Sequence, residues 1–164
     1  MNFADTGIVG LIIGHAIGRI GNFVNREAFG DYYDGLFAME MRLDQVHSIN
    51  AVTQQMLDNT IIRGGLTYIS VHPTFLYEAS INFALFIFLN LYRKHKKFNG
   101  ELLAYYFLVY GTARFFIEGL RTDQLIFFNT GLPISQAISA LLAILGIIIL
   151  INGFTNRGKS PKKA

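Results

Sequence analysis

Residues 18–30 hold the densest group of chemically useful side chains in the sequence, Gly-Arg-Ile-Gly-Asn-Phe-Val-Asn-Arg-Glu-Ala-Phe-Gly. They follow an apolar stretch, where ionisable groups are costly and therefore usually functional. The Arg19 guanidinium is a planar fork of donors that suits a phosphate diester. Asn22 and Asn25 share one face if the helix continues, and Glu27 can accept a hydrogen bond from a ligand hydroxyl or hold Arg19. The run therefore predicts a site for a charged, partly lipidic ligand.

More ordinary interpretations of this run remain open. Arg19 can be an interfacial arginine whose stem lies along apolar surface while its charge reaches water. The two amides can cap a helix that ends in a polar loop, and Glu27 can be a charge partner for Arg26. Gly21 and Gly30 predict tight backbone turns.

A second group occupies residues 72–78, His-Pro-Thr-Phe-Leu-Tyr-Glu. Pro73 suits the first turn of a helix, so Tyr77 and Glu78 should lie about one turn inside a membrane segment. A carboxylate at that depth needs a partner. The alternative is a span that starts at proline and is anchored by an interfacial His72 and Tyr77.

A third group occupies residues 114–123, Arg-Phe-Phe-Ile-Glu-Gly-Leu-Arg-Thr-Asp. Arg114 and Glu118 are four residues apart and share a helix face, which Arg121 continues three residues later. The row predicts an ion-paired stripe that points into the bundle. Ionisable groups inside a membrane segment are costly, so such a stripe indicates a functional site. The alternative is an ion pair that only locks helix packing.

Together the three runs resemble the signature segments of the prolipoprotein diacylglyceryl transferases, bacterial membrane enzymes that attach a diacylglyceryl group to lipoprotein precursors. The first run matches every fixed position of the family pattern G-R-x-[GA]-N-F-aliphatic-N-x-E-x-x-G. The others resemble H-P-[ST]-x-L-Y-E and R-[FW]-x-x-E-x-x-R-x-D. The resemblance covers about residues 3–151 and corresponds to the C-terminal part of the enzyme. The family's earlier His-Gly-Gly segment and tyrosine have no counterpart, so we expect a fragment, a split product or a truncated paralogue.

This resemblance implies that the substrates are phosphatidylglycerol and the lipobox cysteine of a prolipoprotein, joined as a thioether with release of glycerol phosphate. It implies no metal or other cofactor. Arg19 and Arg114 would hold the phosphate, Asn22 and Glu27 would orient the glycerol, and Glu118 completes the catalytic set. The family's histidine is the implied base, with His72 as a weaker substitute. The implied substrate-binding residues are Arg19, Asn25, Gly30, His72, Tyr77, Glu78 and Arg121.

Four apolar segments must position these groups, at about residues 3–17, 74–92, 102–120 and 133–151. The first is marginal as a span by itself, whereas the others are long enough to cross roughly 30 Å of hydrocarbon. The polar stretch 31–72 predicts a small head, with strand-like residues 36–41 and 66–71 and a short helix within 50–60.

The basic residues predict the orientation of the chain. Lysine and arginine concentrate in residues 93–97 and 157–163, and both clusters should be cytoplasmic by the positive-inside rule. Residues 18–30, the head and the end of the third segment then meet at the outer face. We read the basic clusters as topology signals, with no nucleic-acid partner, because no aromatic residues interleave a basic surface.

Composition supports a membrane protein. Hydrophobic residues make up 52% of the 164 residues and charged residues only 15%, against about 25% in soluble domains. The sequence has no cysteine, so it supplies no disulfide, thiolate ligand or cysteine nucleophile. The four histidines show no zinc-ligand spacing.

The expected fold is an all-α, multi-span helical bundle of about four apolar segments, with a small extracytoplasmic α+β head between the first two. The expected divisions are residues 1–30, 31–72, 73–152 and a basic tail, 153–164. Besides the bilayer and the two substrates, the missing N-terminal part of the enzyme is an expected partner, and the bacterial cytoplasmic membrane is the expected location. Two alternatives remain open: a non-catalytic phospholipid-binding relative, and a transporter or channel subunit that uses the stripe at Arg114.

Overall fold

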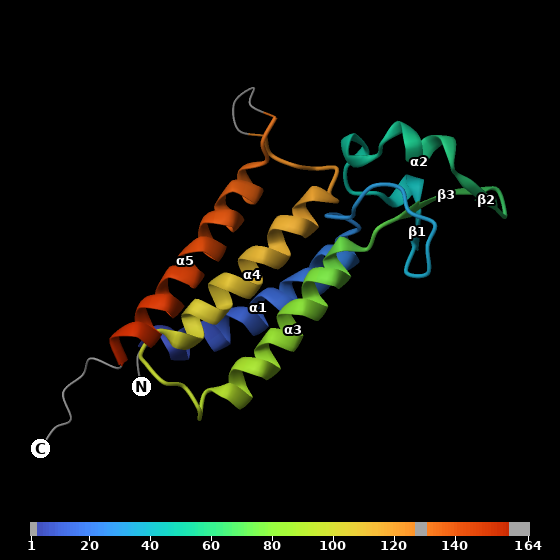
Figure 1. Cartoon of the computed structure of the whole chain (residues 1–164). Helices are drawn as coiled ribbons and strands as arrows, with labels where there is room; N and C mark the ends of the chain where they lie inside the picture. Colours follow the sequence, from blue (N-terminus) through green and yellow to red (C-terminus); the bar gives the residue numbers. More distant parts are fainter. Residues whose placement is uncertain (1–2, 127–130, 158–164) are drawn as a thin grey trace, which may run out of the picture.

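The computed structural model describes residues 3–126 and 131–157. Four long helices lie side by side, and a small group of strands and short helices gathers at one end of them (Figure 1). The elements are α1 (Phe3–Asn25), β1 (Met39–Arg42), η1 (Leu43–Gln45), η2 (Ile49–Ala51), α2 (Gln54–Asp58), β2 (Ile61–Arg63), β3 (Leu66–Val71), α3 (Thr74–Tyr92), α4 (Glu101–Gly119) and α5 (Ile134–Arg157).

The helices pack in two main pairs, α1 against α3 and α4 against α5, with α3 and α4 joining the pairs. The core between α1, α3 and α4 is built from apolar side chains at helical spacing: Ile8, Ile12, Leu85, Leu89, Leu102 and Tyr106. Gly111 and Gly146 lie where α4 and α5 contact each other. A Cβ at Gly111 would lie 2.6 Å from the Ser139 carbonyl oxygen, and one at Gly146 would lie 2.7 Å from the Ala104 oxygen. Such small residues let membrane helices approach closely.

Three described helices, α1, α3 and α5, are long and apolar enough to cross a membrane. The sequence predicted about four spans, and α4 is the segment that does not meet these criteria. It carries Glu101, Arg114 and Glu118 within 19 residues, which lowers its apolar character. It nevertheless runs beside the other three helices (Figure 1).

The first helix is longer than the sequence indicated. We expected a marginal segment ending near Ile17, whereas α1 continues to Asn25 and includes half of the 18–30 run. The tight turn expected at Gly21 is therefore wrong, because Gly21 lies inside α1.

The turn instead follows Asn25. Arg26 has a left-handed φ of 54°, its N–H donates to the Phe23 carbonyl, and the N–H of Glu27 donates to the Asn22 carbonyl. These two bonds form a Schellman motif, in which glycine is the usual left-handed residue.

The head is a three-stranded antiparallel sheet in the order β1-β3-β2, packed on its short helices. Strand β3 matches the predicted residues 66–71, while β1 begins three residues later than the predicted 36–41 segment. The short helix expected within 50–60 is present as η2 and α2. Strand β2 was not predicted; it forms a hairpin with β3 through Gly64 and Gly65, both at positive φ.

The two ends of the bundle differ in character. The head and the ends of the 18–30 and 114–123 runs lie at one end, whereas the α3–α4 connection, the start of α1 and the end of α5 lie at the other (Figure 1). The predicted basic cluster 93–97 therefore lies far from the head. Residues 158–163 of the second basic cluster, and most of the predicted tail, lie outside the described residues.

Candidate functional site

The polar groups of the first run are joined along the end of α1. Arg19 Nη1 donates to Asn22 Oδ1 at 3.0 Å, and Asn22 Nδ2 donates to Glu27 Oε1 at 3.0 Å. Asn25 Nδ2 reaches the same oxygen at 3.2 Å. The Schellman turn folds Glu27 back over the helix. The Glu27 carboxylate can therefore accept hydrogen bonds from the side-chain amides of both Asn22 and Asn25, although Glu27 lies two residues beyond the helix end. Glu27 contacts Arg19 only through Asn22, so the expected direct pair is absent among the described residues.

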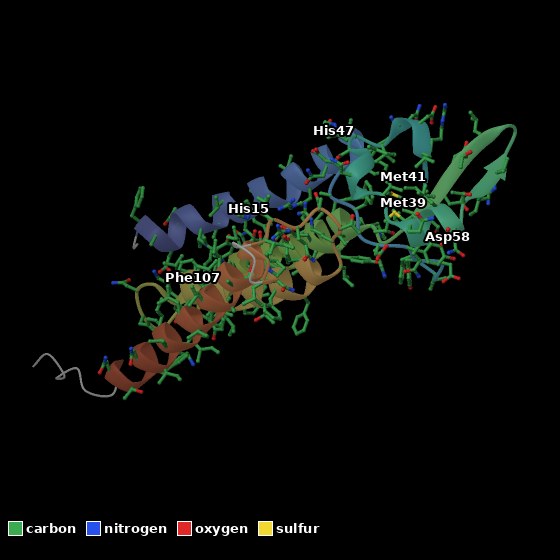
Figure 2. All side chains as sticks on the ribbon, turned by 90° about the horizontal axis from the view of Figure 1, so that it is seen from above. His15, Met39, Met41, His47, Asp58 and Phe107 are labelled. Atoms are coloured by element: carbon green, nitrogen blue, oxygen red, sulfur yellow. The ribbon has the colours of Figure 1, made fainter. Side chains whose placement is uncertain are left out.

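Hydrogen bonding fixes the charge of Glu27. Donation from Asn22, and then from Asn25, lowers the pKa of its carboxyl, which favours the ionised form. His47 Nε2 lies 3.9 Å from Glu27 Oε2. Figure 2 shows His47 beside the end of α1, where the head meets the bundle.

Glu78 on α3 lies between the two arginines that the sequence singled out. Its Oε1 is 2.9 Å from Arg19 Nη2, and its Oε2 accepts a hydrogen bond from Arg114 Nη1 at 2.8 Å. The first contact is an ion pair without hydrogen-bond alignment. Glu78 is only 3% exposed, so the two guanidinium groups supply the compensation that a buried carboxylate requires.

The predicted stripe on α4 continues this network. Arg114 Nη2 lies 2.8 Å from Glu118 Oε2, and Arg121 Nη1 lies 3.9 Å from the same oxygen. Arg121 then donates two hydrogen bonds to Asp123, at 2.8 and 2.7 Å. Burial opposes ionisation of Asp123, but the bonds from Arg121 outweigh it and lower the pKa of the carboxyl. The stripe thus has the pairing that its spacing predicted.

Backbone contacts around Gly30 hold the three runs together. The Gly30 N–H donates to the His72 carbonyl at 2.8 Å, and the Asp31 N–H donates to the Leu120 carbonyl at 3.0 Å. A Cβ at Gly30 would lie 2.7 Å from the Leu120 oxygen and 2.8 Å from His72 Cβ. Gly30 is therefore a point of close chain crossing, and this is the reason for a glycine there.

His72 lies apart from the ion-pair network among the described residues. Its ring stacks on Tyr33 with centroids 3.9 Å apart, and its Nδ1 is 3.3 Å from the Tyr77 hydroxyl. Burial lowers the pKa of the imidazole, which favours its neutral form. The contacts with Tyr33 and Tyr77 hold the His72 ring in a fixed position.

Sequence reasoning missed a polar layer beneath the network. His15 Nδ1 lies 3.4 Å from the Tyr106 hydroxyl, and the His15 and Tyr110 rings are 5.3 Å apart. Figure 2 shows His15 about midway along α1. The available signal was spacing, because His15 precedes Arg19 by four residues and Tyr110 precedes Arg114 by four.

Asn82 also belongs to the interior of α3. It follows Glu78 by four residues, is 1% exposed, and neither of its amide atoms has a hydrogen-bond partner among the described residues. Within that part of the chain, no cluster of acidic and histidine side chains could hold a metal ion.

The three runs thus converge on one connected set of three guanidinium groups and four carboxylates. Over residues 1–152 the sequence matches the family model described as prolipoprotein diacylglyceryl transferase. The chain belongs to this family.

Individual family members are similar over most of the chain. A phosphatidylglycerol–prolipoprotein diacylglyceryl transferase of Clostridioides difficile (strain 630) is 39% identical over 148 residues, which is 90% of this chain and 49% of that protein. The enzyme of the same name from Streptococcus pyogenes serotype M5 is 35% identical over 162 residues, 98% of this chain and 55% of that protein. The chain therefore spans about half the length of these family members. No solved structure matches it.

Proposed function

We propose that this chain provides the phospholipid-binding site of a phosphatidylglycerol–prolipoprotein diacylglyceryl transferase. The observation that carries the proposal is the connected network in which Arg19 and Arg114 both contact Glu78. Two guanidinium groups that converge from separate helices make a site for one phosphate diester. The names of the similar family members supply the donor and acceptor classes.

In the proposed reaction, the sulfur of the lipobox cysteine forms a bond to the glyceryl carbon of phosphatidylglycerol. The bond between that carbon and the phosphate oxygen breaks, glycerol phosphate leaves with the bonding electrons, and a base takes the thiol proton. Negative charge accumulates on the phosphate, where Arg19 and Arg114 stabilise it in a site shielded from water. Asn22 and Glu27 orient the glycerol, and Glu118 holds Arg114 in place.

Glu78 then occupies the position that the lipid phosphate takes. The four carboxylates already outnumber the three guanidinium groups of the network. An incoming phosphate adds more negative charge, so it must take over at least one of the contacts that Glu78 makes with Arg19 and Arg114. Glu78 thus makes the contacts with Arg19 and Arg114 that we propose the lipid phosphate takes over.

We further propose that α4 crosses the cytoplasmic membrane together with α1, α3 and α5, and that the head and the network face outward. The basic residues 93–97 lie at the end of the bundle opposite the head, which supports this orientation. The outer face is where translocated prolipoproteins emerge.

The test is an assay in phosphatidylglycerol liposomes with a lipobox peptide, in which diacylglyceryl peptide is detected by mass. We expect product from the chain alone, or after addition of the N-terminal half of the C. difficile relative. Arg19→Ala should abolish it, and Arg114→Lys should reduce it strongly, because a point charge does not replace the planar fork. Unchanged turnover in both variants would contradict the phosphate role. Phosphatidylglycerol binding without product in either arrangement would identify a non-catalytic lipid-binding relative.

A further inference from the structure

A polar pocket of about 670 Å³ lies at the end of the bundle opposite the head, between the α3–α4 connection and the end of α5 (Figure 1). Lys97 and Asn99 line it from the connection, and Asn152 and Asn156 line it from α5. The three side-chain amides supply donors and acceptors, and the Lys97 ammonium group supplies donors that carry a positive charge. This set of groups suits the oxygens of a phosphate ester.

The Lys97 ammonium group is held in place without being neutralised. It lies 5.3 Å from the centroid of the Phe154 ring, a cation–π contact. Two buried carboxylates at this end of the bundle are engaged elsewhere, because Asp5 pairs with Lys96 at 2.9 Å and Glu101 accepts hydrogen bonds from two backbone N–H groups. Within the described residues no carboxylate forms an ion pair with Lys97, so its charge is available to an anionic ligand.

The polar lining of this pocket continues into an apolar surface along α5. Ile149 also lines the pocket, and its spacing places it on the same helix face as Asn152 and Asn156. Closer to the head, Leu145 is 43% exposed and Ile148 is 48% exposed. The surface of α5 thus changes from amide to aliphatic side chains beside the pocket. Because α5 is a candidate membrane span, this change is typical of the boundary between lipid headgroups and hydrocarbon.

The size and the lining of the pocket favour a lipid over a soluble anion. At about 30 Å³ for each water-sized group, the pocket has room for roughly twenty such groups, so a free phosphate ion would fill only a small part of it. An acidic peptide from the aqueous phase would leave the aliphatic side of the pocket without a partner. A phospholipid presents an anionic headgroup and hydrocarbon next to each other, and basic pockets beside membrane helices are known to hold such headgroups.

We infer that this pocket binds the phosphate headgroup of an anionic glycerophospholipid in the leaflet opposite the head. This lipid is not the donor that we propose at Arg19, because the two sites lie at opposite ends of the bundle (Figure 1). The inference rests on the proposed membrane crossing of α5 and is independent of the proposed substrate site. A lipid bound there links the α3–α4 connection to α5 and acts as a structural ligand.

The chain has no tryptophan, so a single one introduced beside the pocket can report on a bound lipid. The test compares Leu145→Trp with Ile138→Trp, which lies on the same helix but closer to the head and replaces a side chain of similar exposure, 53%. Each purified variant is titrated in detergent with phosphatidylglycerol or phosphatidylcholine brominated in the acyl chains, and the fluorescence quenching is recorded. Ile148→Trp replaces Leu145→Trp if that variant does not fold.

We expect Leu145→Trp to be quenched at a mole fraction about fivefold lower for phosphatidylglycerol than for phosphatidylcholine, the effect of one lysine on an anionic lipid. Adding Lys97→Gln should remove this preference, and Lys97→Arg should retain it. Lys94→Gln is the matched control, because it removes the same charge from the same connection but does not line the pocket. It should leave the preference at position 145 intact. Quenching of Ile138→Trp should not respond to Lys97→Gln.

Other results would overturn the inference, and they separate it from the proposed function. A preference that survives Lys97→Gln but disappears with Arg19→Ala would assign the quenching lipid to the proposed donor site, which would support the proposed function. Equal losses in Lys94→Gln and Lys97→Gln would show a general effect of basic charge without a pocket. Loss of the preference in phosphate buffer, but not in chloride of equal ionic strength, would make this a site for free phosphate. Displacement of the lipid by an acidic peptide, but not by unlabelled phosphatidylglycerol, would make it a protein-binding site.

Discussion

At the scale of single residues, the main feature is that one buried carboxylate serves two arginines. Glu78 contacts Arg19 on α1 and Arg114 on α4, and it is almost completely buried. Removing one member of a buried ion pair usually costs far more than the pair contributes, because a charge is left without a partner. Glu78 should therefore control both the stability of the network and its response to an anionic lipid.

This predicts opposite effects of Glu78→Gln with and without lipid. In neutral detergent the variant should lose on the order of 3 kcal/mol of stability, because two guanidinium groups lose their shared anion. Phosphatidylglycerol should then raise the melting temperature of the variant more than that of the wild type, since its phosphate restores the missing charge. Thermal melting with and without the lipid measures both effects.

The matched control is Asn82→Leu, one turn further along the same face of α3. Its amide has no hydrogen-bond partner among the described residues, so replacing it should cost little stability and leave the lipid response unchanged. Equal gains from lipid in Glu78→Gln and the wild type would refute the idea that Glu78 occupies the phosphate position.

Glu27 predicts a pH dependence whose sign follows from its hydrogen bonds. Because donation from Asn22 and Asn25 lowers its pKa in the folded chain, ionised Glu27 stabilises the fold above the ordinary pKa of a glutamate, about 4.3. That contribution is lost as the pH falls through the lower folded pKa. Melting temperatures of the wild type and Glu27→Gln should therefore differ at pH 7 and converge as the pH falls below the lowered pKa. A gap between the wild type and Glu27→Gln that stays constant over this pH range would count against the prediction.

At the scale of elements, the close approach of α4 and α5 depends on two glycines. A side chain at Gly111 or Gly146 meets backbone atoms of the other helix, which cannot move aside as a flexible side chain can. Gly111→Val and Gly146→Val should each lower the melting temperature strongly. Gly14→Ala in α1 is the control, because a Cβ there meets nothing within 4 Å, and alanine favours a helix by about 1 kcal/mol. A melting temperature unchanged by both valines would show that the pair can separate without cost.

Sequence patterns predicted elements well where local signals are strong. Strand β3 and helix α3 have their predicted bounds, because alternation and a starting proline define them. The pair Arg114–Glu118 followed from helical spacing alone.

The failures have physical causes. The end of α1 was missed because the left-handed residue of its Schellman motif is Arg26 rather than glycine. The contacts of Glu78 with Arg19 and Arg114 join separate helices, and no local pattern specifies such a pairing. For the same reason, the chain crossing at Gly30 was not predicted.

At the scale of the whole molecule, the bundle has one end with the head and the network and another with the basic α3–α4 connection (Figure 1). The absence of cysteine makes this orientation directly testable. In intact cells a membrane-impermeant thiol reagent should label Asp58→Cys in the head, whereas Lys94→Cys should react only after the membrane is opened. The reverse pattern would invert the proposed topology, and labelling of both sites in intact cells would contradict it.

The shared role of Glu78 has a consequence for how this sequence can change. Arg19 and Arg114 are far apart in the sequence, yet each is balanced by the same carboxylate, so a change at one alters the charge that the other experiences. Substitutions in the two segments should therefore be strongly epistatic. A substitution that is harmful alone in one helix should be tolerated together with a second substitution in the other helix. The two segments should therefore change together, although they are distant in the sequence.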